Sequence, residues 1–181
     1  MLEFKNSILG NQEAKAVATQ RSERSIDQIR RDVYNSHRHR VYALAYYMTG
    51  DEITAETMLA RCFTQAFLSK AEPDASDVDE SLLGALREDG VLGEMEWRPM
   101  PKVDAGAATG NILRTDMEEA LRELPAAERL IFLLSDVEGY SAAKIASLAG
   151  RPEREIAIAV IAVRLRMRET IAAIRKQREA A

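Results

Sequence analysis

The clearest feature of the chain is a pair of neighbouring segments whose apolar residues repeat with helical spacing. The first segment ends at Gly50, and the second begins after Asp51 or Thr54, either of which can cap a helix. The repeating positions are Val41, Leu44, Ala45 and Met48 in the first segment and Ala55, Leu59, Cys62, Phe63 and Ala66 in the second. Because this spacing is typical of amphipathic helices, it predicts helices over 26–49 and 52–70 that form an antiparallel hairpin.

The last third of the chain has the same helical period, interrupted by residues that end or begin helices. Gly139 and Gly150 are placed to end two helices, Ser141 to cap one, and Pro152 to open the last. The predicted helices cover about 112–123, 126–137, 142–149 and 153–178. This order predicts a four-helix domain that contains a helix-turn-helix, the arrangement of many DNA-binding domains.

The segments outside these two modules have weaker patterns. Residues 1–25 are polar, and we expect a flexible N-terminus there. Residues 71–115 contain ten acidic and four basic side chains, together with three of the five prolines, which predicts an acidic linker with a short helix over 79–88. The predicted fold class is therefore all-α, with two modules small enough that we expect them to contact one another.

The chemistry-bearing residues do not suggest a catalytic, cofactor or metal site. The single cysteine, Cys62, lies on an apolar stripe and is expected to be an inert core thiol, and His37 and His39 fall on different helix faces. No Gly-rich phosphate loop or nucleophile motif beside a base is present. We also find no export signal and no apolar run near the ~20 residues that span a bilayer, so we expect a cytoplasmic protein without a membrane partner.

Two stretches of the sequence resemble the extracytoplasmic-function class of bacterial RNA polymerase sigma factors. The shorter stretch comprises residues 41–51, Thr54-Ala-Glu56 and Phe63-Thr-Gln-Ala66-Phe67. The longer one comprises Leu121-Arg-Glu-Leu-Pro125, Arg129-Leu-Ile-Phe132-Leu, Asp136-Val-Glu-Gly139-Tyr-Ser141, Lys144-Ile-Ala146 and Gly150-Arg-Pro152. The first resembles the hairpin of that family that binds core polymerase, and the second resembles its promoter-binding helix-turn-helix domain, here residues 116–178.

The resemblance implies binding to RNA polymerase core through the hairpin and to promoter DNA through the last domain. The implied polymerase-binding residues are Asp51, Glu56 and Phe63. The implied DNA-binding residues are Ser141, Lys144, Arg151, Arg154, Arg164, Arg166 and Arg168. For Asp51 and Glu56, stabilisation of the helix N-terminus by acidic groups is an equally good interpretation.

The sequence departs from the family pattern in two places, which indicates a degenerate member. After Phe67, where such factors carry an aromatic and basic helix that melts promoter DNA, this chain has the acidic run 71–80. In place of small polar and basic residues after the turn, the last helix has Glu155 followed by the apolar run 156–163. Acidic groups repel phosphates, and an apolar helix face lacks the donors that read base edges.

The final helix carries apolar residues on two opposite sides. One side comprises Ile156, Val160, Val163, Met167, Ile171 and Ile174, and is expected to face the core of its domain. The other comprises Ile158, Ile161 and Leu165. We expect this second face to be covered by protein: the first module, an anti-sigma-like partner, or another copy of the chain.

Two functions remain open on the sequence alone. The chain is either a sigma-factor-like transcription regulator that binds polymerase core and promoter DNA, or a sigma-like adaptor that binds protein partners through its final helix and does not read DNA. Because phosphate contacts make binding strongly salt-dependent, DNA binding at varied salt separates the two.

Overall fold

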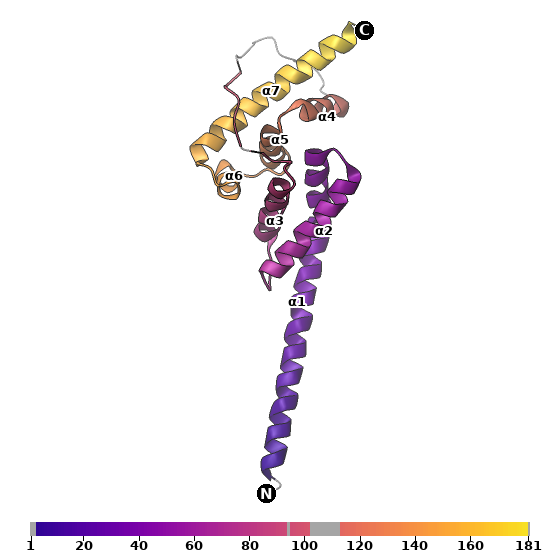
Figure 1. The fold of residues 1–181 in the computed structure, drawn as a ribbon, viewed down its shortest axis with the longest axis vertical. Helices are drawn as coiled ribbons and strands as arrows, with labels where there is room; N and C mark the ends of the chain where they lie inside the picture. The colour runs from indigo at the N-terminus through magenta and orange to yellow at the C-terminus, as the bar shows by residue number, and fades with distance from the viewer. Residues whose placement is uncertain (1–2, 94, 102–112, 181) are drawn as a thin grey trace.

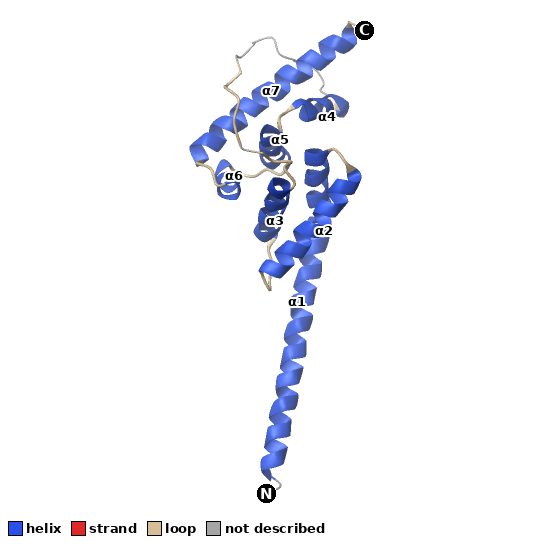
Figure 2. Cartoon of the chain, in the orientation of Figure 1, coloured by secondary structure: helices blue, strands red, loops and turns tan. Residues whose placement is uncertain are grey.

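All regular structure in the described part of the chain is helical (Figure 2). The computed structural model describes residues 3–93, 95–101 and 113–180, with side chains from Ser25 onward. Seven α-helices and one π-helical turn lie within these residues, and no strand does. The predicted all-α fold class is confirmed.

The N-terminal module begins with one very long helix, α1 (Glu3–Thr49), whose first half projects away from the rest of the molecule (Figure 1). Residues 3–25 belong to this helix, and the flexibility expected over 1–25 stays a prediction. Residues 3–25 contain no proline and a single glycine, Gly10. Because extending an existing helix is far easier than nucleating one, the helix that packs on the core from Val33 onward continues through this segment.

The predicted hairpin forms between α1 and α2 (Glu52–Ser69). Gly50 adopts a left-handed conformation with φ of 72°, which turns the chain between the two helices. The Asp51 side chain then caps α2 by accepting a hydrogen bond from the Thr54 backbone N–H at 2.7 Å.

The acidic segment contributes a third helix to this module, α3 (Ala75–Glu88), which begins four residues before the predicted short helix. A reciprocal capping box between Asp74 and Asp77 fixes its start. One side of α3 packs on α1 and α2 through Val78, Leu82, Leu83 and Leu86. The segment 71–115 is therefore not only a linker, because its apolar residues at helical spacing complete the core of the hairpin.

The C-terminal module contains the four expected helical segments. These are α4 (Arg114–Glu123), α5 (Ala126–Phe132) continuing into the π-helical turn η1 (Leu133–Val137), α6 (Ala142–Ala149) and α7 (Glu153–Glu179). Gly150 ends α6 with φ of 66°, as its place in the sequence predicts. The first apolar side of α7 faces the core, because Ile156, Val163, Met167, Ile171 and Ile174 are buried and Val160 packs against them.

The two modules contact one another, as expected from their small size. Buried apolar residues of both form one continuous core. On α5, Arg129 donates hydrogen bonds to the carbonyl oxygens of Tyr47 and Met48, at 3.2 and 3.3 Å, at the end of α1. Residues 95–101 run from the first module along α5 and α7, where Trp97 bonds Glu155. Among the described helices, none is long and apolar enough to cross a membrane.

Candidate nucleic-acid interface

The helix-turn-helix is formed by α6, the turn around Gly150 and the first half of α7. The Ser141 hydroxyl caps α6 by accepting a hydrogen bond from the Lys144 backbone N–H at 3.2 Å. Beyond Gly150, the Arg151 backbone N–H bonds the Ala146 carbonyl at 3.1 Å, which closes the end of α6. Ser141 therefore has a structural role in placing α6, whether or not it also contacts DNA.

Several of the predicted DNA-binding cations are held by acidic groups of the chain itself. Lys144 lies 3.2 Å from the buried carboxylate of Asp79 on α3. Arg164 bonds Asp136 at 2.8 Å, and Arg151 bonds Glu155 four residues along the helix. These pairs lower the positive charge that this face offers to phosphates.

Arg166 lies in the interior, which differs from its predicted place on a DNA-binding surface. Its guanidinium lies 2.5 Å from Glu128 of α5 and also donates to the Pro99 carbonyl. Arg98 bonds the same carboxylate at 2.5 Å. Burial alone would raise the pKa of Glu128, but the hydrogen bond from Arg98 and the charges of both arginines outweigh burial and lower it. Arg166 thus ties α7 to α5 and to residues 95–101.

The exposed side of α7 is apolar in its middle and basic at its ends. Ile158 and Ile161 are 49% and 54% exposed, and Leu165 is half-buried. Arg154 and Arg168 are exposed along the same stripe and make no ion pair with any described residue. Within the described residues, the first module contacts this domain through α3 and α6, and Ile158 and Ile161 stay exposed. A protein cover over this face stays a prediction.

Val137 is another exposed apolar side chain of this domain. It ends η1 and is 59% exposed. Its neighbour Asp136 bonds Arg164, which brings the end of η1 next to the middle of α7.

The predicted polymerase-binding residues lie at the start of α2, with one exception. Asp51 and Glu56 are exposed. Hydrogen bonds from the Thr54 side chain and backbone lower the pKa of Asp51, so this carboxylate is firmly ionised. Between them Ile53 is 75% exposed, a residue that the sequence analysis did not identify because it lies off the apolar stripe.

The exception is Phe63, whose side chain is in the core of the hairpin. It is 3% exposed and packs edge-on against Tyr34, with ring centroids 4.9 Å apart. Phe63 belongs to the apolar stripe of α2, which predicts burial, and the side chain is buried in the structure. Phe63 is therefore a core residue of the hairpin, and its side chain is too buried to contact a partner.

Cys62 is the core thiol that the sequence predicts. It is fully buried, its sulfur lies 3.2 Å from the Val78 carbonyl, and burial raises its pKa to about 12. No cluster of three or more His, Cys, Asp or Glu side chains that could hold a metal occurs among the described residues.

Comparison with known protein families identifies one domain. Residues 114–160, about a quarter of the chain, match the family described as Sigma-70, region 4. This stretch runs from the start of α4 into the first part of α7, and it contains the whole helix-turn-helix. Over these residues the chain is similar to region 4 of sigma-70 proteins, and the match does not extend to the hairpin of α1 and α2. No curated protein sequence matches the chain.

Proposed function

We propose that this protein is a sigma-factor-like transcription regulator, a degenerate relative of the extracytoplasmic-function class, which binds RNA polymerase core in the cytoplasm. The observation that carries the proposal is the helix-turn-helix of α6 and α7 within residues that match sigma-70 region 4. A helical hairpin precedes this domain, in the order in which the family has its polymerase-binding and promoter-binding parts.

Polymerase binding is proposed for the surface at the start of α2. Asp51 and Glu56 supply negative charge there, and Ile53 supplies an exposed apolar side chain between them. An apolar contact surrounded by charges is the usual composition of a protein interface. The same acidic groups also stabilise the N-terminus of α2, so their charge has two roles in the proposal.

Promoter binding is proposed to be weak and to rest mainly on phosphate contacts. Among the described residues, Arg154, Arg168 and Lys176 are the exposed cations of α7 without an ion-pair partner. Arg154 and Arg168 lie on the stripe of Ile158 and Ile161, whereas Lys176 lies near the far end of the helix. Base reading needs Arg, Lys, Asn or Gln in the groove, whereas Ile158 and Ile161 hold the intervening positions. Such a helix favours backbone binding with little sequence discrimination.

A second candidate function is that of a sigma-like adaptor that binds protein and does not read DNA. The exposed apolar side chains of Ile158 and Ile161 on α7 favour it, because exposed apolar patches commonly mark protein contacts. The partner would be an anti-sigma-like protein or another copy of this chain.

Binding to a promoter-containing DNA fragment at increasing salt, with core polymerase present, distinguishes the two functions. For a DNA-binding regulator, log K falls linearly with log salt, by about 0.9 per phosphate contact. Replacing Arg154 and Arg168 by Ala reduces that slope, whereas Lys176→Ala, near the far end of α7, leaves it unchanged. The protein's affinity for core polymerase is measured with and without the DNA fragment. If the DNA leaves both this affinity and its salt dependence unchanged, the adaptor function is supported and the DNA-binding function is contradicted.

A further inference from the structure

A cavity of about 400 Å³ lies where the end of α1 meets α4 and α5. Its α1 side is lined by Tyr46 and Tyr47, together with Gly50 of the turn that follows. Sites for small molecules commonly have volumes of about 300–1,000 Å³, so the cavity is large enough for a ligand. Because its walls come from both modules, a ligand bound there contacts both of them.

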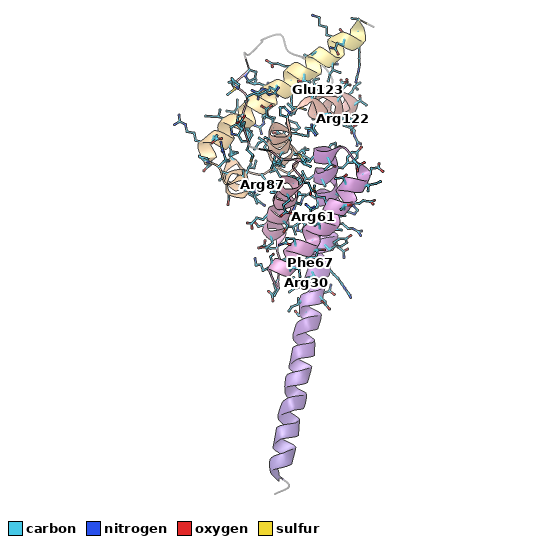
Figure 3. All side chains as sticks on the ribbon, in the orientation of Figure 1. Arg30, Arg61, Phe67, Arg87, Arg122 and Glu123 are labelled. Carbon is cyan, nitrogen blue, oxygen red and sulfur yellow. The ribbon has the colours of Figure 1, made fainter. Side chains whose placement is uncertain are left out.

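The α4 and α5 side of the cavity is strongly basic. It is lined by Arg114 and Arg122 of α4 and by Arg129 of α5, and Glu118 is the one acidic residue of the lining. Arg122 is exposed close to the end of α1 (Figure 3) and makes no ion pair with any described residue. Three positive charges and one negative charge leave the cavity with a net charge of +2.

The guanidinium of Arg129 is bonded to carbonyl oxygens and has no anionic partner among the described residues. Its acceptors are the carbonyls of Tyr47 and Met48 on α1 and those of Arg122 and Leu124 at the end of α4. Burial lowers its pKa, but an arginine stays protonated at neutral pH. Its Nε is buried and has no hydrogen-bond partner in the described part of the chain. Since buried donors are usually bonded and buried charges are usually paired, this cation favours an anion as the ligand of the cavity.

The pair of Arg114 and Glu118 shows how the cavity can hold an oxyanion. The Glu118 carboxylate accepts a hydrogen bond from Nε of Arg114 at 2.7 Å, one turn away on α4. The Arg114 side chain is 86% exposed, so this pair is weak. A phosphoryl group has more negative charge and more acceptor oxygens than a carboxylate, and can therefore replace Glu118 as the partner of Arg114.

We propose that this cavity binds a small phosphorylated anion of the class that includes inorganic diphosphate and the nucleoside diphosphates. Arg114 and Arg122 bind the phosphoryl oxygens, and Arg129 adds positive charge behind them. Tyr46 and Tyr47 lie in the same cavity, where an aromatic ring can stack on a nucleobase. The site uses none of the residues proposed to bind polymerase or DNA, so it does not depend on the proposed function.

The test is isothermal titration calorimetry of the full chain with inorganic diphosphate and, separately, with ADP, at constant ionic strength. The main variant is Arg122→Gln, because the Arg122 side chain makes no hydrogen bond to any described residue and its loss should not affect folding. The matched control is Lys176→Gln, which removes the same charge from an exposed site near the far end of α7. Arg129 is left unchanged because it holds the ends of α1 and α4 together.

The parent should bind inorganic diphosphate, and Arg122→Gln should bind it at least about tenfold more weakly, the loss typical of one hydrogen bond between charged groups. Lys176→Gln should bind as the parent does. Glu118→Gln should bind about two- to fivefold more tightly, because the competing carboxylate is removed. Glu123→Gln, on the same helix but outside the cavity, should match the parent. Damage to the fold does not produce such a gain in affinity.

The outcomes decide both the site and its ligand. Absence of binding of either anion by the parent overturns the site. Equal affinities of the parent, Arg122→Gln and Lys176→Gln also overturn it, because the anion then binds elsewhere. If circular dichroism shows that Arg122→Gln does not fold, equal affinities of Glu118→Gln and Glu123→Gln overturn the site and a gain confined to Glu118→Gln supports it.

The comparison of the two anions identifies the part of the ligand that is recognised. Tighter binding of ADP than of inorganic diphosphate supports the site and shows that the nucleoside is bound as well. Equal binding of the two supports a site that recognises the phosphoryl groups alone.

Discussion

The cluster around Glu128 should be one of the most sensitive points of the fold. Its carboxylate is 1% exposed and receives bonds from Arg98 and Arg166. Arg98 is half-exposed, so that pair is worth about 1 kcal/mol or less. Arg166 is buried, and removing the charge from its partner leaves an unpaired cation in the interior, which costs about 3–5 kcal/mol. Glu128→Gln should therefore destabilise the fold by about 3 kcal/mol.

Urea unfolding followed by circular dichroism measures this loss. With a slope of about 1–3 kcal/mol per molar urea, the midpoint should fall by about 1–3 M. The matched control is Glu123→Gln on α4, whose side chain is exposed (Figure 3). This control should change the free energy of unfolding by less than about 0.5 kcal/mol.

The same carboxylate makes stability depend on pH. Because the pKa of Glu128 is lowered in the folded protein, its ionised form stabilises the fold above the ordinary glutamate pKa, about 4.3. This stabilisation is lost as pH falls from that value through the lowered folded pKa. The difference between the parent and Glu128→Gln should consequently shrink below about pH 4. If the parent and Glu128→Gln have equal urea midpoints at pH 7, the ion pairs of Glu128 do not stabilise the fold.

Two further predictions concern the exposed face of α7 and the core thiol. Changing Ile158 to Lys and Ile161 to Arg should leave the melting temperature within about 2 °C, since both side chains are exposed, and should steepen the salt dependence of DNA binding. A large fall in melting temperature, with loss of an oligomer, would instead show that another copy covers this face. Native Cys62, with its pKa raised to about 12, should not react with a thiol reagent at pH 8 until the protein unfolds.

The parts of the fold that follow from local pattern were predictable from the sequence. The apolar stripe of α7 and the caps at Ser141 and Gly150 lie within a few residues of the helices they define, and the structure has them as expected. The helical period and the capping residues depend only on residues close together in the chain, so one sequence is enough to identify them.

The buried ionic contacts could not be predicted, because each one joins segments far apart in the sequence. Asp79 lies in an acidic run that has the composition of a linker, and its partners lie on α1 and α6. Arg166 belongs to a basic stretch that resembles a DNA-binding surface, yet its partner Glu128 lies 38 residues away. Charge alone gives no sign of burial, which depends on how the helices pack.

The most direct test of the proposed function is equilibrium binding of the full chain to RNA polymerase core at low salt. The parent should bind, and the pair Asp51→Lys and Glu56→Lys should bind at least about tenfold more weakly, because the docking charges change sign. Glu56→Lys alone, which retains the Asp51 cap, should show an intermediate loss.

The control for net charge is the pair Glu80→Lys and Glu123→Lys, which makes the same change in charge at exposed sites elsewhere. This control should bind core polymerase as the parent does. Absence of binding by the parent at low salt, or equal binding by the parent and the Asp51→Lys and Glu56→Lys pair, would contradict the polymerase-binding role proposed for the start of α2.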